Sequence, residues 1–338
     1  MRRLILSSLL LCCSAPLFAS PGKPYKIMML LYRGTTDAEK GFMAYLHRRK
    51  IPVKFTICDG QADNGKIAAC VQTAKTLQPD LIYSFGTTVT AELVGLQGQV
   101  KPGLHVTDIP VVFDIVADPI GARLISDMKS SGRNLTGVSH LVPLAAQMKA
   151  LQSMRGTRHI GVLYNPQEKN SLLAVQELER IAPQFDMSVQ LKPVALDRNN
   201  NPSADGLHKA VKELLANKPQ FVYIPSDSFL IKNAKTVVQA ANLAGIPVFA
   251  ATEAPIRNDG ALLGLVSNYF NVGEFAGYKA EQILVKKIPP SQIPVDVLHR
   301  FTYLVNMTTA KKLRIYPPAA ILKIAEAIMP LDAIDARE

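Results

Sequence analysis

The sequence predicts an α/β protein with two parallel β-sheets, each covered by helices. Short apolar runs typical of strands alternate with segments of helical periodicity, and this alternation starts again after residue 138. The length of 338 residues and the hydrophobic fraction of 48% suit two cores of ordinary size. Because no close internal repeat is visible, the two halves are expected to share architecture but not sequence.

The N-terminal residues have the features of a secretory signal peptide. Arg2 and Arg3 precede an apolar run at 4–11, and a region suited to cleavage follows at 16–20. The apolar run is far shorter than the roughly 20 residues that span a bilayer. We therefore expect residues 1–19 to be removed and the mature protein to lie in a periplasm. Cys12 and Cys13 suggest a lipid anchor as an alternative, which the bulky Leu11 disfavours.

The first half of the mature chain contains four strand-like runs with helical segments between them. The expected strands are 26–31, 53–57, 81–85 and 111–115, and the expected helices are 37–48, 64–76 and 88–96. Repeated βα units place helices on both faces of a parallel sheet, so these strands are expected to be buried on both sides.

The second half repeats the pattern and then returns to the first. The expected strands are 160–164, 189–194, 221–224 and 248–250, and the expected helices are 144–154, 171–181, 204–216 and 232–243. The glycine-containing segment 261–270 suits a crossing between lobes, and a helix at 272–285 follows it. A proline-rich connection at 288–294 then leads to a strand at 303–306. Residues 319–329 are predicted to form an amphipathic helix that packs on a lobe.

The mature chain is basic without the signature of a nucleic-acid site. Removing residues 1–19 takes away two of the 38 basic residues and none of the 27 acidic ones, which leaves a net charge of +9. The basic residues are scattered and are not clustered with aromatic ones. We therefore expect a solvated basic surface and no nucleic-acid partner.

Two cysteines remain after processing, Cys58 and Cys70, in a compartment where disulfides persist. Two interpretations fit them: a disulfide that closes a short loop, or two small buried hydrophobic side chains. The spacing alone does not decide between them. No histidine or second cysteine pair stands nearby at ligand spacing, so no metal site is expected.

Several short motifs, in their order and spacing, carry a resemblance to a known family. These are VVFDIVADPIGARL, NLTGVS, HIGVLYNPQEKNS, FVYIPSDS and IPVFAATEAPIRNDGALLGLVSNYFNVGEFAGYKAEQIL. Together they make the chain similar to the periplasmic substrate-binding proteins of ABC transporters, in the tryptophan/tyrosine-type family. The resemblance implies the type I periplasmic-binding-protein fold, in which two Rossmann-like lobes are joined by a hinge of three crossovers. It also implies closure on a small ligand.

The resemblance also suggests how the chain is divided and what it binds. The expected N-terminal lobe comprises 24–139 and 269–298, and the expected C-terminal lobe comprises 140–268 and 299–338. The implied ligand is an amino acid, with aromatic ones among the alternatives. Tyr32, Phe85, Phe229 and Tyr269 are the aromatic side chains expected near such a ligand, unless they belong to the cores.

Candidate ligand contacts in the first lobe lie where strands end, because loops and helix N-termini converge at that edge of a parallel sheet. The candidates are Arg33, Gly34, Thr35, Gly86, Thr87, Thr88 and Asp114. Residues 86–88 open a helix, so backbone N–H groups and the helix dipole can receive a carboxylate there. Thr87 can instead cap that helix. Arg33 can pair with an anionic group or be solvated, and Asp114 can hold an ammonium group.

Candidate contacts in the second lobe follow the same rule. They are Asn165, Ser226, Asp227, Thr252 and Glu253, with Asn268 and Tyr269 on the return crossover. Asp227 is the preferred partner for a ligand's ammonium group, because a buried charge demands a paired charge. Its alternative role is to cap a helix that begins near Phe229. Tyr269 can stack on a ligand ring or pack the hinge.

The sequence lacks the signatures of common catalytic sites. It contains no Gly-x-Ser-x-Gly elbow, P-loop, dinucleotide fingerprint or His-Glu-x-x-His motif. We therefore expect no catalytic residues and no cofactor, but a monomer that binds a small molecule and then docks on the membrane permease of an ABC importer. The alternative is a periplasmic sensor or accessory protein that signals to a membrane receptor. The residues do not separate these two.

Overall fold

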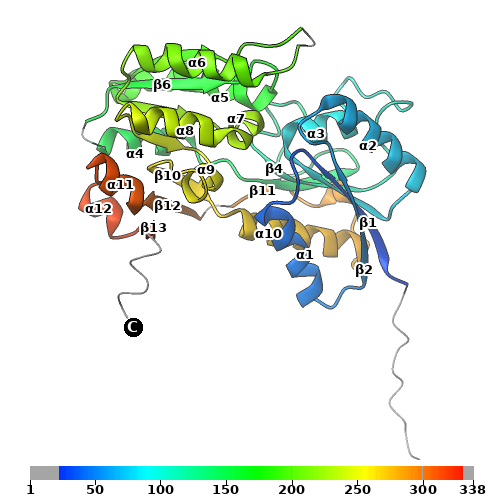
Figure 1. Ribbon diagram of the computed structural model, residues 1–338. Helices are drawn as coiled ribbons and strands as arrows, with labels where there is room; N and C mark the ends of the chain where they lie inside the picture. The colour runs from blue at the N-terminus through cyan, green and yellow to red at the C-terminus, as the bar shows by residue number, and fades with distance from the viewer. Residues whose placement is uncertain (1–22, 155, 199, 299, 330–338) are drawn as a thin grey trace, which may run out of the picture.

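The chain folds into two α/β lobes that lie side by side, with the N-terminal lobe on the right of Figure 1 and the C-terminal lobe on the left. This computed structural model describes residues 23–329, except 155, 199 and 299. The expected signal peptide, residues 1–19, lies outside the described residues. Within the described part of the chain, no helix combines the length and apolarity needed to cross a membrane.

A six-stranded sheet forms the centre of the N-terminal lobe, and all its neighbouring strands are parallel. Its spatial order is β11-β5-β4-β3-β1-β2. The strands are β1 (Tyr25–Leu31), β2 (Val53–Asp59), β3 (Leu81–Phe85), β4 (Val111–Val116), β5 (Leu135–Ser139) and β11 (Asp296–Val297). Strands β3, β4 and β5 are buried along their whole length, as expected for a parallel sheet covered on both faces.

The helices of this lobe are α1 (Asp37–Arg48), α2 (Asn64–Leu77), α3 (Gly86–Val94) and α10 (Tyr269–Leu284). Helix α10 arrives from the C-terminal lobe and lies beside α1 (Figure 1). The contact is so close that a Cβ atom on Gly273 would lie 1.8 Å from the carbonyl oxygen of Ala38. Glycine is therefore required at position 273 to fix the returning chain on this lobe.

A seven-stranded sheet forms the centre of the C-terminal lobe, in the order β13-β12-β10-β9-β8-β6-β7. Its strands are β6 (His159–Tyr164), β7 (Ser188–Pro193), β8 (Phe221–Ile224), β9 (Val248–Ala250), β10 (Leu263–Ser267), β12 (Phe301–Asn306) and β13 (Glu326–Ile328). All pairs are parallel except β10 with β12. Side chains of β8 alternate between two apolar clusters, Tyr223 on one face and Val222 and Ile224 on the other.

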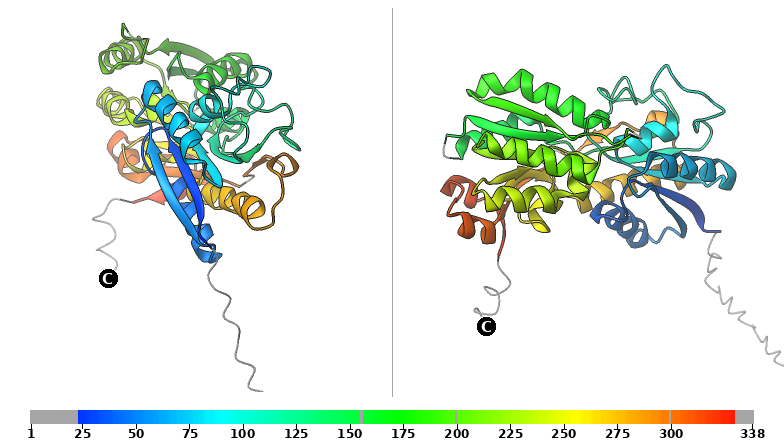
Figure 2. Two further views of the ribbon diagram at one scale, coloured as in Figure 1. Left: turned by 90° about the vertical axis from the view of Figure 1, so that its right-hand side faces the viewer. Right: turned by 45° about the horizontal axis from the view of Figure 1, so that its top comes forward.

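Helices surround this second sheet, as the views in Figure 2 show. The helices are α4 (Leu144–Ser153), α5 (Lys169–Ile181), α6 (Ala204–Ala216), α7 (Ser228–Lys232), α8 (Ala234–Leu243), α9 (Glu253–Arg257), α11 (Met307–Leu313) and α12 (Ala319–Leu322). The 3-10 turn η1 (Ala182–Phe185) belongs to this lobe, whereas the 3-10 turn η2 (Pro290–Gln292) lies in the N-terminal lobe beside β5. The chain passes from one sheet to the other three times, between β5 and α4, between β10 and α10, and between β11 and β12.

The predicted α/β class is confirmed, but the prediction for residues 319–329 is wrong. Instead of one amphipathic helix, the segment forms the four-residue helix α12 and then strand β13, which pairs in parallel with β12. The strand provides backbone partners for the open edge of β12, which a helix would have left unpaired. The helix predicted at 232–243 is present as α8, which begins two residues later because Asn233 separates it from the short helix α7.

Candidate functional site

In the part of the chain that the structure describes, three cavities lie between the lobes, each lined by residues of both. The largest, about 850 Å³, has Thr87 and Thr88 on the N-terminal side and Gln167 and Lys169 on the C-terminal side. A second, about 310 Å³, is lined by Arg33, Thr35 and Tyr269 opposite Glu253 and Arg257. A third, about 530 Å³, lies between Arg33 and Gln61 on one side and Asn201 and Lys232 on the other. Together they mark the cleft that the two lobes enclose.

Residues 86–88 lie at the edge of this cleft, at the end of β3. Gly86 has φ +79°, a backbone conformation that favours glycine, and this turn begins α3 directly after the strand. The N-cap of α3 is Phe85, and no side chain caps the helix by a hydrogen bond. The alternative role of Thr87 as a helix cap is therefore wrong. Thr87 is buried, and with Thr88 it faces the largest cavity.

Arg33 stands at the centre of the cleft, in the segment that follows β1. Its guanidinium carbon lies 5.5 Å from the centroid of the Phe85 ring, and Nη1 lies 3.5 Å from the carbonyl oxygen of Ser228, on the opposite lobe. Within the described residues Arg33 takes part in no ion pair. A half-buried cation without a carboxylate partner is a natural receiver for an anionic group.

Asp114 lies on β4, inside the N-terminal lobe. It is fully buried, and its Oδ1 accepts a hydrogen bond from the N–H of Ile115 at 3.0 Å. The Tyr83 hydroxyl bonds Asp114 Oδ2 at 3.2 Å and Glu39 Oε1 at 2.8 Å. Burial, and then the nearby charge of Glu39, raises the pKa of Asp114 well above its usual value. These contacts give Asp114 a role within the lobe.

Asp227 is held by the backbone and side chains of its own lobe. It is the N-cap of α7: Oδ1 accepts from the N–H of Leu230 at 2.9 Å, and Oδ2 accepts from the N–H of Asn165 at 2.7 Å and from the Ser171 hydroxyl at 2.6 Å. The alternative role that the sequence suggests, a helix cap, is therefore present. Asn165 is used in the same way, because its own Oδ1 accepts from the N–H of Gln167.

A second carboxylate, Glu168, lies beside Asp227 and was not anticipated from the sequence. Both of its oxygens accept from the N–H of Ser228, at 3.0 and 2.9 Å, and Oε1 also accepts from Asn170 Nδ2 at 3.0 Å. Burial and the charge of Asp227 raise the pKa of Glu168 to about 7. Within the described residues, neither acid forms an ion pair.

The crossovers that join the lobes also border the cleft. His140 Nε2 lies 3.0 Å from the Ser226 hydroxyl, and the His140 ring meets that of Tyr269 edge-on at 5.5 Å. Burial, with the positive charge of Arg33, lowers the pKa of His140 to about 3, so this histidine is neutral at physiological pH. The Ser267 hydroxyl donates to the His140 carbonyl at 2.6 Å, which ties the first crossover to the second.

Glu253 and Asn268 stabilise the second crossover. Glu253 forms an ion pair with Arg257 at 3.0 Å and accepts from the N–H of Tyr269 at 3.0 Å. Asn268 caps α10 through the N–H of Asn271. Of these residues, Glu253 and Tyr269 line the second cavity.

Four buried polar atoms around the cleft have no hydrogen-bond partner within the described residues: His140 Nδ1, Asn170 Oδ1, Thr252 Oγ1 and the Tyr269 hydroxyl. The Arg33 guanidinium is near enough to oppose the rise that burial causes in the pKa of Tyr269, but no hydrogen bond of ordinary geometry joins them. Buried polar atoms in proteins are nearly always bonded, so unpartnered ones mark places where a ligand or water binds.

Comparisons with known proteins decide the family. The model of the family described as ABC transporter substrate binding protein matches residues 34–329. The chain belongs to this family. It is 25% identical, over 282 residues, to a tyrosine-binding protein of Clostridioides difficile (strain R20291), which covers 82% of this chain and 76% of that protein.

Solved structures agree on the fold of this substrate-binding protein. The ABC domain in complex with L-Trp from Streptococcus pneumonia is 25% identical, covers 90% of this chain and 100% of its own, and has a TM-score of 0.78. A conserved domain protein from Vibrio cholerae is 22% identical, covers 90% and 99%, and has a TM-score of 0.80. The predicted type I periplasmic-binding fold is confirmed.

The sequence prediction missed Glu168, although the signal was present. Glu168 follows β6 by four residues, within the same strand-end loop as Asn165. The end of a strand indicates only the first polar residue of the loop that follows it, which here is Asn165. The turn at Asn165, however, leads into α5, so Glu168 becomes the N-cap of that helix and its carboxylate bonds the N-terminus of α7.

No group of three or more potential metal ligands occurs among the described residues.

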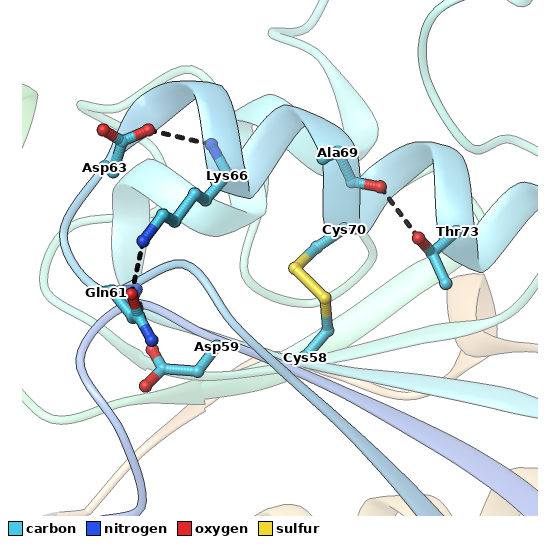
Figure 3. The surroundings of a disulfide bond; sticks show 8 residues. All are labelled: Cys58, Asp59, Gln61, Asp63, Lys66, Ala69, Cys70 and Thr73. Atoms are coloured by element: carbon cyan, nitrogen blue, oxygen red, sulfur yellow. Dashed lines mark hydrogen bonds between the residues drawn. A yellow bond between two sulfur atoms is a disulfide. The ribbon is translucent and has the colours of Figure 1, made fainter.

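A disulfide supports the N-terminal margin of the cleft. Cys58 and Cys70 are joined, with their Cα atoms 5.8 Å apart, so β2 is linked to α2 (Figure 3). The loop between them contains Gln61 and Asp63, both of which line the third cavity. Lys66 bonds the side chain of Gln61 within this loop. The bridge thus restrains a segment that faces the C-terminal lobe.

Proposed function

We propose that this protein captures an amino acid in the cleft between its lobes and delivers it to the membrane permease of an ABC importer. The signal-peptide features of residues 1–19 support a periplasmic location for this work, and a monomer is sufficient for it. The role is one of binding without catalysis, as in the family's described function of substrate binding.

The observation that carries the proposal is the meeting of unpaired opposite charges at the junction of the lobes. Ser228 contacts both the cation and one of the acids. Its carbonyl oxygen lies 3.5 Å from Arg33 Nη1, and its N–H donates to Glu168 Oε2 at 2.9 Å. A ligand with both a carboxylate and an ammonium group satisfies the cation and the acids together. Arg33 and the turn at 86–88 would receive the carboxylate, and the side of the cleft that holds Asp227 would receive the ammonium.

Besides its carboxylate and ammonium groups, the ligand is expected to carry an aromatic side chain. The largest cavity adjoins Thr87 and Thr88 and has apolar walls provided by Ala91, Leu96, Val100 and Leu104. Its size, about 850 Å³, lies within the range of small-molecule sites. One relative is named for tyrosine binding and another was solved with L-Trp. Tyrosine and tryptophan are therefore the first candidates for this chain.

Thermal unfolding of the mature protein against the twenty amino acids tests this function. At a ligand concentration of about a thousand times Kd, binding stabilises a protein by roughly 4 kcal/mol, which raises Tm by several degrees. We expect a selective rise with L-tyrosine or L-tryptophan. A panel of sugars is the matched control. A rise with a sugar, and none with any amino acid, would contradict the proposal.

A further inference from the structure

The acids Glu168 and Asp227 form a buried pair without a cation. Their side chains are held by neighbouring N–H groups of one short helix: Glu168 by Ser228 and Asp227 by Leu230. Glu168 is 3% exposed and Asp227 0%, and neither forms an ion pair within the described residues. Two adjacent buried carboxylates cannot both remain ionised at low cost, so one holds a proton.

The hydrogen bonds indicate which acid is protonated. Burial raises the pKa of Asp227 as well, but two N–H groups and the Ser171 hydroxyl donate to it and oppose that rise by stabilising its charged form. Glu168 also has donors, the N–H group and side chain of Ser228 and the Asn170 amide, but these do not outweigh its burial and the charge of Asp227. Burial and the charge of Asp227 raise the pKa of Glu168 to about 7. The proton is therefore held on Glu168.

A second observation points to a ligand at this pair. Asn170, which bonds Glu168 through Nδ2, is 8% exposed, and its Oδ1 is buried without a partner within the described residues. That oxygen is an acceptor beside two acids, which is the environment that an ammonium group with three N–H donors requires. A sugar hydroxyl or an acylated nitrogen carries no positive charge and could not neutralise the two acids. One acid would then keep its proton, or its charge would have no partner.

Other titratable and charged groups lie near the pair. Tyr32 and Arg33, in the segment after β1, are close to the two acids and to Ser228, whereas Lys169 of α5 lines the largest cavity and Lys232 of α7 contacts the N-terminal lobe. Burial, reinforced by the charges of Glu168 and Asp227, raises the pKa of Tyr32, so this phenol remains neutral. Arg33 reaches the carbonyl oxygen of Ser228, and Lys232 donates to the carbonyl oxygen of Gln61. None of these groups forms an ion pair with either acid.

We infer that Glu168 is the residue that selects an amine ligand, because it releases its proton to solvent when the ligand's ammonium group pairs with the two acids. This inference rests on the proposed function and specifies its chemistry. The exchange balances: the protonated acid loses H⁺ to water, and the carboxylate that remains is neutralised by the incoming cation. Amino acids with a free ammonium group should bind, and N-acylated ones should not.

The sign of the pH dependence follows from this exchange. Below pH 7 the ligand must displace a proton, so affinity should fall about tenfold for each pH unit below 7. Above pH 7 Glu168 is ionised before binding, and affinity should become constant until the ligand's own amine loses its charge. Measured at pH 6, binding should release close to one proton.

Isothermal titration of the mature protein with L-tyrosine and L-tryptophan at pH 6 tests the inference. Matched titrations in two buffers that differ in ionisation enthalpy measure the protons released. We expect nearly one proton for the wild type and none for Glu168→Gln, with no binding of N-acetyl-L-tyrosine. Glu177→Gln, an exposed acid on the same helix that pairs with Arg180, should release as many protons as the wild type.

A measurement without ligand shows whether the variant folds and whether the proton is held. Because Glu168 binds its proton more tightly when folded, the free energy of unfolding should decrease between about pH 5 and pH 7, and Glu168→Gln should lose most of that dependence. Amino-acid binding without proton release, or equal affinity for N-acetyl-L-tyrosine, would overturn this inference and leave the proposed function intact. Failure of every amino acid to bind would overturn both, and an unchanged pH dependence of stability in Glu168→Gln would show that no proton is held.

Discussion

At the scale of single residues, Arg33 is the side chain whose loss should affect binding most directly. It is half-buried in the cleft, lies over Phe85 and forms no ion pair among the described residues. If it receives the ligand's carboxylate, Arg33→Ala removes one partner of a desolvated pair. We expect a loss of about 2 kcal/mol or more, which is roughly a 30-fold rise in Kd, measured by titration calorimetry.

Two variants separate this role from a general effect of charge. Arg33→Lys keeps the charge but loses the planar fork, so its affinity should lie between those of the wild type and Arg33→Ala. Arg180→Ala removes a positive charge from an exposed pair with Glu177 and should bind like the wild type. Equal Kd values for Arg33→Ala and the wild type would place the carboxylate elsewhere in the cleft.

At the scale of elements, the disulfide between β2 and α2 is expected to contribute substantially to stability. It closes a loop across a sequence separation of 12 residues. Restricting the unfolded chain by a loop of this length stabilises a protein by about 3 kcal/mol. Replacing both Cys58 and Cys70 with alanine should lower the free energy of unfolding by about that amount in guanidinium titrations. Dithiothreitol should destabilise the wild type similarly and leave the double variant unchanged, whereas equal stabilities without reductant would contradict the prediction.

The elements also show what the sequence could and could not predict. Strands 81–85 and 221–224 and helices 37–48 and 204–216 were predicted with their observed bounds, because apolar periodicity and clear caps act locally. Residues 319–329 were not, since the edge of β12, which is distant in sequence, determines that β13 forms. The candidate site, too, could be predicted only where the signal is local in the sequence. Strand ends indicated the cleft, but the pairing of Glu168 with Asp227 depends on how two loops pack against each other.

At the scale of the whole molecule, the contacts between the two lobes provide a way to measure closure of the cleft. Arg33 reaches the Ser228 carbonyl, and Lys232 Nζ reaches the carbonyl oxygen of Gln61 at 3.3 Å, so each lobe contributes a cation to the other. A ligand that bridges the cleft binds the closed arrangement in preference to the open one and therefore shifts the population toward it. The backbone around these contacts should then exchange its amide hydrogens more slowly.

Hydrogen exchange with and without L-tyrosine tests this closure. At about 100 times Kd, we expect segments 59–63 and 226–233 to exchange up to about 100-fold more slowly, because local opening must first release the ligand. Helix α6, on the outer side of the C-terminal lobe in Figure 1, provides the control within the same sample and should change little. Protection confined to one lobe would mean that the ligand binds without closing the cleft. Protection of both segments together requires that the ligand couples them, since they lie on opposite lobes and more than 160 residues apart in sequence.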